Sequence, residues 1–391
     1  MKSVRDFNLK GKPVLVRCDF NVPLDEKGEI EDDFRLKKAI PTINYLIEAG
    51  AIIVLISHLG RPKGKKNENY TLRPVALRLS ELLEKDVKFI DNYLSVGTKR
   101  KISAMKEGEI SLLENLRFYE GEENANPDFA KSLSKLGSFF INDAFGVCHR
   151  KHASVIGLPE LLPSGSGFLL EKEIEVLSDL LEKPKEPMVA IIGGIKVPSK
   201  IKAAKGLLRS SYHVLLGGRI YEPLLQAKGI LIGRKWPEEE VIEIIREMNL
   251  TDTRIHLPID GLACLSNLEE GYSREVAIGR VRKEERIYDI GPETINLFSS
   301  LIKEAKTIIW AGPLGFFEKK PFDKGSIAIA EAIVENKSAF KVSGGGDTNF
   351  FLLKYDFRDK FDYISTGGGA MLAFLAGEAL PGIKALQKNG N

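Results

Sequence analysis

Arginine and histidine side chains gather in short basic motifs in the first half of the chain. These motifs contain Arg35, His58, Arg61, Arg117 and Arg150. A guanidinium group stays charged at physiological pH, and its planar fork matches the oxygens of a carboxylate or phosphate. The first half therefore predicts a site for a small acid that carries several negative charges.

Every run of adjacent glycines lies in the second half of the chain, at Gly193-Gly194, Gly217-Gly218, Gly344–Gly346 and Gly367–Gly369. Glycine lets the backbone approach a ligand closely, and the N–H groups and dipole of a helix N-terminus attract an anion. These turns therefore predict a site for the phosphates of a nucleotide. An acid site in one half and a nucleotide site in the other indicate phosphoryl transfer across a cleft.

Polar side chains in the first half follow the ends of apolar runs. Asp19 and Asn21 come directly after one such run, and His58 and Arg61 follow another. Each motif alone has a plainer explanation, because Asp and Asn commonly stabilise turns. A single arginine is usually a solvated surface charge. The carboxyl ends of parallel strands meet at one crevice, so the joint placement of these residues favours a binding site.

Two lysines stand at a predicted helix start. Residues 193–200 have the pattern of a strand end, a tight glycine turn and a helix, which places Lys196 and Lys200 one turn apart. Cations near a helix N-terminus are unfavourable against the helix dipole unless an anion compensates them. We therefore expect a bound anion beside these lysines, and a merely solvated helix start is the weaker alternative.

Another glycine turn carries groups suited to a metal–nucleotide complex. Gly345 and Gly346 precede Asp347 and Thr348 at a strand end. A carboxylate is a hard oxygen ligand of the kind Mg²⁺ prefers, and a hydroxyl can bind phosphate. Gly367–Gly369 open a further helix, where each glycine costs about 0.5–1 kcal/mol relative to alanine. That cost favours an anion-binding nest.

Short β-branched runs alternate with helical patterns along the chain. The runs lack polar alternation, as is typical of parallel strands buried on both faces. Strands are predicted at 13–16, 51–56, 139–141, 189–192, 214–216, 307–310, 340–342 and 363–364. Helices are predicted at 35–49, 72–83, 198–208, 238–248, 292–305 and 325–334. We therefore predict an α/β fold of two Rossmann-like parallel-sheet domains, with ligands at the carboxyl ends of the strands.

The chain is too long, at 391 residues, for one ordinary core, so two domains are expected. A stretch rich in proline, glycine and serine ends the first domain, and an amphipathic helical pattern follows it. We predict a first domain at 1–165, a connecting helix at 166–184 and a second domain at 185–372. The helix would serve as a strut next to a hinge that closes the cleft.

The composition excludes several classes of protein. Hydrophobic residues make up 43% of the chain and charged residues 28%, which indicates a globular protein and not a disordered one. The formal net charge is only +3 and no basic run stands out, so we expect no nucleic-acid partner. The three cysteines are far apart and predict neither disulfides nor a zinc site. No apolar run reaches the ~18 residues of a membrane span, so we expect no membrane association and a cytoplasmic location.

Missing motifs narrow the chemistry further. The sequence has no G-x-x-x-x-G-K-[ST], no G-x-G-x-x-G and no H-R-D, which argues against P-loop NTPases and protein kinases. His149 and His152 could suggest a general base. No serine or cysteine nucleophile accompanies them in the sequence, and a structural role is favoured for His152.

Together these motifs resemble the phosphoglycerate kinase family. The resemblance runs from residues 14–24 to 380–382, which is nearly the whole chain. The matching segments between them are 57–64, 113–122, 142–157, 193–200, 289–294, 310–318, 344–348 and 365–370. The resemblance implies a monomeric enzyme of glycolysis and gluconeogenesis. Its reaction would move a phosphoryl group reversibly from 1,3-bisphosphoglycerate to MgADP, giving 3-phosphoglycerate and MgATP.

The resemblance also implies a role for each site residue. The glycerate would be held by Asp19, Asn21, Arg35, His58, Arg61, Arg117 and Arg150. The nucleotide would be held by Lys200, Gly217, Gly218, Gly291, Glu318, Gly345, Gly346, Asp347 and Thr348, with Glu318 on the ribose and Asp347 on Mg²⁺. Catalytic roles would fall to Arg35, Lys196, Gly367, Gly368 and Gly369. Residues 373–391 would pack back on the first domain.

Two departures from the family pattern bear on the nucleotide site. Ala311 stands where the family usually has Asn, and Pro198-Ser199 precede the second lysine. The residues also leave two other functions open: a kinase for a different carboxylate or acyl phosphate, and an inactive relative that acts as a nucleotide-binding or interaction module. The presence of Arg35 and Asp347 counts against the inactive relative.

Overall fold

The computed structural model describes residues 1–231, 235–266, 268 and 272–388. By its internal contacts the chain divides into two compact units. One unit combines Met1–Glu175 with Ala379–Asn391, and the other is Val176–Glu378. The division falls inside helix α7 (Phe168–Glu182), the helix that the sequence predicts as the connection.

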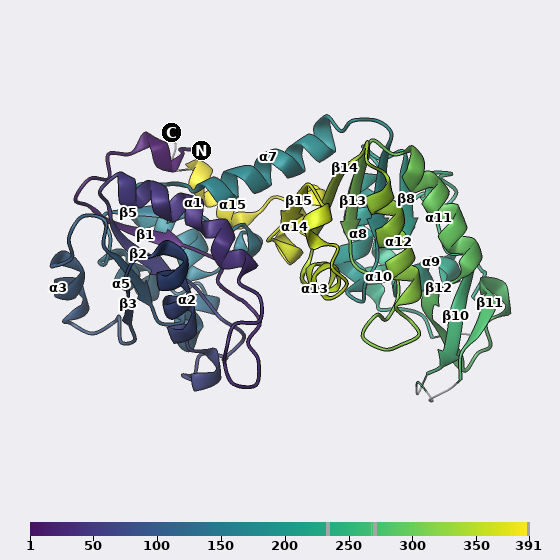
Figure 1. The fold of residues 1–391 in the computed structure, drawn as a ribbon, viewed down its shortest axis with the longest axis horizontal. Helices are drawn as coiled ribbons and strands as arrows, with labels where there is room; N and C mark the ends of the chain where they lie inside the picture. Colours follow the sequence, from purple (N-terminus) through teal and green to yellow (C-terminus); the bar gives the residue numbers. More distant parts are fainter. Residues whose placement is uncertain (232–234, 267, 269–271, 389–391) are drawn as a thin grey trace. The chain divides into compact units, whose positions relative to one another are not determined.

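The described part of the first unit contains a six-stranded sheet in which all neighbouring strands are parallel (Figure 1). Its order is β3-β4-β2-β1-β5-β6. The strands are β1 (Pro13–Arg17), β2 (Ile52–Ile56), β3 (Val87–Ile90), β4 (Ile110–Leu113), β5 (Phe139–Asn142) and β6 (Ser164–Ser166). The helices are α1 (Phe34–Glu48), α2 (Arg73–Leu83), α3 (Thr98–Ser103), α4 (Glu120–Glu123), α5 (Pro127–Ser134) and α6 (Leu158–Leu161).

Helix α1 shows how the sequence covers this sheet. Its buried side chains include Leu36, Ala39, Ile43 and Leu46, which recur at intervals of three or four residues. That spacing places them on one face of the helix, which packs on the sheet while the other face meets solvent. Strand β2 is buried along its whole length, because helices cover both faces of a parallel sheet.

Helix α15 (Pro381–Lys388) belongs to the first unit although it follows the second unit in sequence (Figure 1). The N–H of Gly382 donates to the carbonyl oxygen of Cys148 at 2.9 Å. A Cβ atom at Gly382 would lie 3.0 Å from Cys148 Cα, so this helix packs tightly on the unit. Of the expected returning segment, 373–378 group with the second unit and 389–391 lie outside the described residues.

The second unit holds a second parallel sheet, of six strands in its described part, with the order β15-β14-β13-β7-β8-β9. The strands are β7 (Met188–Ile192), β8 (His213–Leu216), β9 (Ile255–His256), β13 (Thr307–Ala311), β14 (Phe340–Gly344) and β15 (Tyr363–Ser365). The helices are α8 (Val197–Leu207), α9 (Tyr221–Ala227), α10 (Glu239–Arg246), α11 (Pro292–Glu304), α12 (Lys324–Glu335), α13 (Gly346–Lys354) and α14 (Gly368–Leu375).

The second unit also contains an antiparallel sheet of three described strands, which the sequence analysis does not single out. Strand β10 (Asp260–Leu265) pairs with β11 (Arg274–Ala277) on one side and β12 (Glu285–Ile290) on the other. Its strands mix buried and exposed residues, as antiparallel sheets with a solvated face do. These strands therefore lack the uninterrupted apolar runs that mark the parallel strands.

The predicted α/β fold of two parallel-sheet units is confirmed. Each helix and strand predicted above is present, with ends that differ by at most two residues from the observed ones. Helix α11, for example, begins at Pro292. Proline is favoured at the first position of a helix, because its fixed φ suits the helix and no N–H is needed there.

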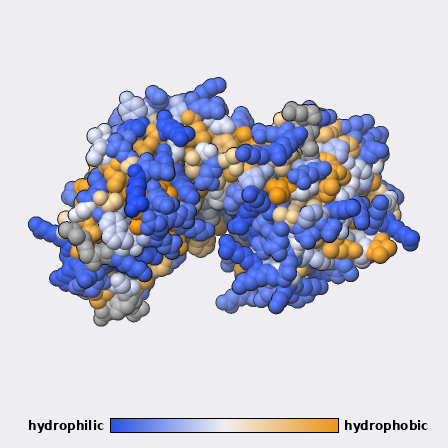
Figure 2. All heavy atoms as spheres, turned by 180° about the vertical axis from the view of Figure 1, so that it is seen from behind, coloured by the Kyte–Doolittle hydropathy of each residue, from blue (hydrophilic) through white to orange (hydrophobic). Residues whose placement is uncertain are grey.

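Figure 2 shows one face of the molecule, on which hydrophilic residues predominate and hydrophobic ones stand in scattered small groups. Scattered apolar residues are normal on a folded chain. Among the described residues, no helix combines the length and the apolar character that crossing a bilayer requires.

Candidate active site

In the first unit, Arg35 and Asp19 form an ion pair beyond the carboxyl end of β1. Arg35 Nη1 donates to Asp19 Oδ1 at 2.9 Å and to the carbonyl oxygen of Asn21 at 3.1 Å. The Asp19 side chain is almost fully buried, whereas that of Arg35 is 24% exposed. The carboxylate therefore fixes the guanidinium while part of it stays accessible to a ligand.

The loop at Gly60 is held between two of the predicted substrate residues. Asn21 Oδ1 accepts a hydrogen bond from Gly60 N at 2.8 Å, and Arg117 Nη1 donates to Gly60 O at 2.7 Å. Gly60 has a φ of +60°, and a Cβ there would lie 2.4 Å from the Tyr70 ring. Glycine is required at this turn, and the turn brings together motifs nearly 100 residues apart in sequence.

Three histidines near these arginines are neutral at neutral pH. Burial lowers the pKa of His58 well below its ordinary value, with nearby arginines adding to the effect. Burial likewise lowers the pKa of His149 to about 4 and that of His152 to about 3. The positive charge of this region therefore belongs to its arginines, which do not titrate in the physiological range.

Arg17, which the sequence analysis missed, lies beneath this region. Its side chain is fully buried, with Nε donating to Ser154 Oγ at 3.0 Å and Nη2 to His58 Nδ1 at 3.2 Å. The Glu122 carboxylate balances its charge at 3.9 Å and accepts from Ser154 Oγ at 2.6 Å. Arg17 is a charged residue at the end of an apolar strand, and this was the signal in the sequence. A buried charge in such a position is costly unless a partner compensates it.

The other two predicted arginines are more accessible. The side chain of Arg61 is exposed and that of Arg150 is half-buried. Burial lowers the pKa of Arg117 to about 10, and the charges of Arg17 and Arg150 act in the same direction. Arginines that repel one another across a partly buried site are stabilised by an anion.

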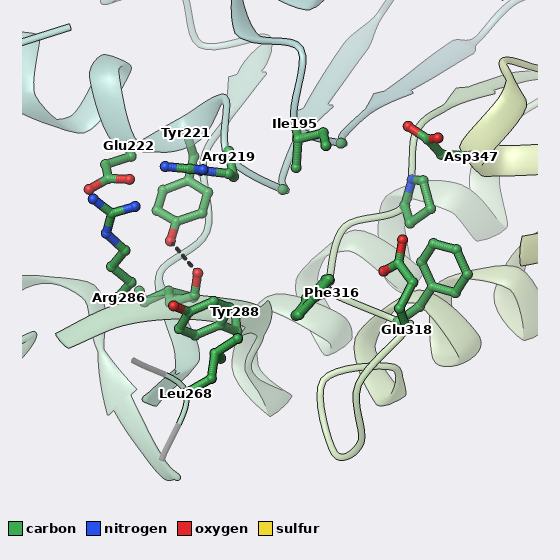
Figure 3. Close-up of a pocket in the computed structure, with 16 residues that line it drawn as sticks. Ile195, Arg219, Tyr221, Glu222, Leu268, Arg286, Tyr288, Phe316, Glu318 and Asp347 are labelled. Atoms are coloured by element: carbon green, nitrogen blue, oxygen red, sulfur yellow. Dashed lines mark hydrogen bonds between the residues drawn. The ribbon is translucent and has the colours of Figure 1, made fainter. Parts of the chain in front are cut away.

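In the second unit, a cavity of about 270 Å³ is lined in part by loops that follow the parallel strands (Figure 3). Gly194 follows β7, Gly218 follows β8 and Pro313 follows β13. The order of the sheet reverses between β13 and β7, and ligands of open α/β sheets bind outside the strand ends at such a switch point. Glu318 and Asp347 also line the cavity.

The glycines of these loops allow backbone to pack directly on backbone. A Cβ on Gly312 would lie 2.2 Å from Gly193 O, and one on Gly218 would lie 2.3 Å from Gly194 N. Gly218 and Gly312 also have φ values of +60° and +99°. No other residue fits these positions without displacing a neighbouring loop.

The backbone N–H groups of Gly217 and Gly218 are both engaged within the protein. The N–H of Gly217 donates to Ile192 O at 2.9 Å, and that of Gly218 donates to Leu314 O at 3.0 Å. These glycines join the loops together, and Gly218 lines the cavity through its surface.

Free helix N-termini come instead from α13 and α14. Gly345 caps α13 with a φ of +105°, and space for a Cβ on Gly346 is open. A Cβ on Gly368 would lie 3.5 Å from Gly346 N, so the two helices start side by side. The first N–H groups of a helix have no acceptor within it, and two adjacent helix starts form an anion site.

Lys200 lies between the strand ends and is 6% exposed. Its Nζ donates to the carbonyl oxygen of Ala311 at 2.8 Å, a contact with backbone that does not depend on the Ala311 side chain. Burial lowers the pKa of Lys200 to about 8, and the Asp347 carboxylate opposes that shift. Lys196, at the N-cap of α8, is exposed and available to a ligand.

Two residues predicted to hold the nucleotide have other contacts. The Thr348 hydroxyl is buried, donates to Gly344 O at 3.0 Å and accepts from Gly312 N at 2.7 Å, so it joins β14 to the loop after β13. Gly291 caps α11, where a Cβ would lie 2.3 Å from the Asp260 carboxylate. Among the described residues that line the cavity, Gly291 is absent.

The sequence analysis also missed the polar side chains at one end of the cavity, which are Arg219, Tyr221, Glu222, Arg286 and Tyr288. Some follow the Gly217-Gly218 turn and others stand on strand β12. The glycine pattern does not indicate these side chains, because they come from two segments that are distant in the sequence and meet only in the folded chain.

The fold is that of a two-unit α/β phosphotransferase, with clustered arginines on one unit and a cavity at the strand ends of the other. The phosphoglycerate kinase family model matches residues 4–378. The chain belongs to the phosphoglycerate kinase family.

Named relatives support this assignment over the full chain. A phosphoglycerate kinase of Borrelia garinii subsp. bavariensis is 46% identical, with 99% of this chain and all of the relative covered. One from Dictyoglomus turgidum is 46% identical, with 98% of each chain covered. The solved phosphoglycerate kinase from Coxiella burnetii has a TM-score of 0.82 at 37% identity and covers 100% of both chains. The structure from Pyrococcus horikoshii OT3 has a TM-score of 0.84 at 34% identity, covering 100% of this chain and 99% of its own.

Proposed function

We infer that the chain catalyses the phosphoglycerate kinase reaction of glycolysis and gluconeogenesis. The reaction transfers a phosphoryl group reversibly between 1,3-bisphosphoglycerate with ADP and 3-phosphoglycerate with ATP. The division of the site carries this inference: clustered arginines lie on one unit, and a cavity beside two helix starts lies on the other.

In the direction that consumes ATP, the attacking group is the carboxylate of 3-phosphoglycerate. A carboxylic acid of ordinary pKa near 4 is ionised at neutral pH, so the reaction needs no general base. Burial lowers the pKa of His58, His149 and His152, which makes these histidines weak bases. This agrees with a reaction that needs no general base. Catalysis then depends on positioning the reactants and on neutralising charge.

Arg35 and Lys196 are proposed to flank the transferring phosphoryl group. Arg35 is preoriented by Asp19, and Lys196 is exposed at a helix N-cap. Charge spreads over the equatorial phosphoryl oxygens in the transition state, where fixed cations and helix N–H groups stabilise it. The starts of α13 and α14 would supply those N–H groups, with Gly368 and Gly369 contributing, whereas the N–H of Gly367 donates to Ser365 Oγ at 3.1 Å.

Asp347 is proposed to hold Mg²⁺ together with the nucleotide. The carboxylate is exposed in the first turn of α13 and lines the cavity, so it fits an ion that takes one carboxylate, phosphate oxygens and water. When bound, Mg²⁺ neutralises charge on the phosphates. Glu318 would contact the ribose.

We propose that the two sites meet when the units close about α7. Reacting atoms must come within ~3–3.5 Å, and each ligand set belongs to a separate unit. Closure would also exclude water from the transferring group. The protein is proposed to act as a cytoplasmic monomer.

A coupled assay with 3-phosphoglycerate and MgATP tests the function. We expect ADP production that depends on both substrates and on Mg²⁺. Replacement of 3-phosphoglycerate by acetate, a carboxylate without phosphate, should abolish it. Equal rates with both acids would contradict the proposed substrate.

A further inference from the structure

One end of the cavity in the second unit carries opposite charges. We call Glu222, Arg286 and Tyr288 the base end. Glu222 is on α9 and Arg286 on β12, and Figure 3 shows their charged groups near each other, at the end opposite Asp347. Burial raises the pKa of Tyr288, while the charges of Arg286 and Glu222 act on it with opposite sign. Both charged groups and the Tyr288 ring line this cavity.

The order of groups along the cavity indicates which part of a nucleotide reaches the base end. Asp347 and the start of α13 mark the phosphate end, and Figure 3 shows Glu318 on the same side of the cavity as Asp347, with Phe316 between it and Tyr288. A nucleotide with its phosphates at Asp347 and its ribose near Glu318 places its base at Tyr288. The rings of Tyr288 and Phe316, 6.2 Å apart between centroids, offer faces for stacking.

The carboxylate and guanidinium discriminate between purines. Guanine presents N1–H and N2–H₂ donors next to the O6 acceptor, so a carboxylate and an arginine side by side match its edge. Adenine reverses both polarities, because N1 is an acceptor and the 6-amino group is a donor. Glu222 would face the adenine N1 lone pair and Arg286 would face the amino hydrogens, which disfavours adenine.

The proximity of Glu222 and Arg286 in Figure 3 does not prevent this recognition. A carboxylate has about four lone-pair sites, and a guanidinium has five N–H donors. Both groups can therefore bind each other and a base edge at once. Tyr221 closes the same side through a 3.2 Å hydrogen bond from its hydroxyl to Ile287 O, which ties α9 to β12 and holds the two charges in place.

We propose that the base end recognises guanine, with Glu222 accepting from N1–H and N2–H₂ and Arg286 donating to O6. The enzyme accordingly uses MgGTP and MgGDP at least as well as MgATP and MgADP. This proposal rests on the proposed function, since it names the nucleotide of that reaction.

Steady-state kinetics with 3-phosphoglycerate and MgATP, MgGTP or MgITP test it. We expect kcat/KM for MgGTP to equal or exceed that for MgATP. MgITP keeps O6 and N1–H but lacks the 2-amino group. Its kcat/KM should therefore fall between that for MgGTP and that for a nucleotide without this match. A kcat/KM for MgGTP more than about tenfold below that for MgATP overturns the guanine assignment and leaves the kinase function intact. Failure of all three nucleotides overturns the kinase function itself.

Variants test which side chains distinguish guanine from adenine. Glu222→Gln should lower the ratio of kcat/KM for MgGTP to that for MgATP by about tenfold or more, the scale of one bidentate base contact. Glu239→Gln, whose side chain is 68% exposed on α10, is the matched control and should leave the ratio unchanged. An unchanged ratio in Glu222→Gln contradicts the proposal.

Two further measurements keep the test independent of folding and of turnover. Arg286→Gln should lower the same ratio, and it tests the base end if Glu222→Gln fails to fold. Calorimetric titration of the intact protein with MgGDP and MgADP should give a Kd for MgGDP no higher than that for MgADP. A clearly weaker Kd for MgGDP refutes the recognition of guanine.

Discussion

Arg35 Nη1 lies 2.9 Å from Asp19 Oδ1, so a buried carboxylate orients a guanidinium that is still partly open to a ligand. Arg35 lies in the first turn of helix α1 and Asp19 follows strand β1, so the pair fixes one element against the other. Preorganised charge of this kind stabilises a transition state without having to move.

Arg35→Ala should reduce kcat by about 10²–10³, the scale for loss of one transition-state donor. The affinity for MgADP should change little, because Arg35 belongs to the other unit. Turnover assays and calorimetry measure the two effects. Arg100→Ala, at an exposed position of α3, serves as the control. A normal kcat with a raised KM for 3-phosphoglycerate would reassign Arg35 to ground-state binding.

Asp347→Asn should weaken binding of MgADP by about tenfold or more, since an interaction with a charged group is lost. Binding of 3-phosphoglycerate should be nearly unchanged. Calorimetric titration with each ligand separates these outcomes, and Asp359→Asn, at an exposed position, is the matched control. Equal losses for both ligands would show that the two sites are not divided as proposed.

Thr348→Val should destabilise the protein by about 1–3 kcal/mol, the penalty for leaving a buried polar group without its partner. The reason is that Gly312 N–H loses the hydroxyl that accepts its 2.7 Å hydrogen bond. Urea denaturation measures the free energy of unfolding. Thr348→Ser keeps the hydroxyl and should retain most of the stability, and equal losses in both variants would contradict this role.

Asp143→Asn should change how stability depends on pH. Asp143 Oδ1 accepts from Leu169 N at 2.9 Å at the start of α7, and burial raises the pKa of this carboxyl to about 7 from 3.8. A carboxyl with a raised pKa in the folded state contributes stability that is full below about pH 4. That contribution is lost as the pH rises through 7.

The variant lacks this titration, so its free energy of unfolding should improve relative to the wild type as the pH rises from about 4 to about 8. Urea denaturation at both pH values measures the difference. Asp179→Asn, exposed on the same helix, should show no such change. If the free energy of unfolding of the variant falls relative to the wild type as the pH rises, the pH dependence assigned to Asp143 has the wrong sign.

Closure of the two units should require both substrates, because each ligand alone contacts mainly one unit and shifts the equilibrium little. Small-angle scattering should show a larger decrease in the radius of gyration for the ternary complex than for either binary complex. Full compaction with nucleotide alone, or none with both ligands, would contradict the proposal that Arg35 and Lys196 meet across the cleft.

The sequence by itself determined the elements and the chemistry of their ends. Apolar runs such as Ile52–Ile56 lack polar alternation, which is typical of a strand buried on both faces, and this signal is local. The same holds for the glycines beside Asp347 and for the positions of Arg35 and Lys196. Strand ends of parallel sheets converge, so these residues could be assigned to two sites before any contact was known.

Tertiary structure alone decided which groups those residues bind. Thr348 has the chemistry of a phosphate ligand, and its hydroxyl instead joins two loops; the N–H groups of Gly217 and Gly218 are likewise taken by backbone carbonyls. Arg17 finds its balancing charge in Glu122, about a hundred residues away. A residue type fixes what a group can bind, whereas its partner depends on long-range packing that no local period encodes.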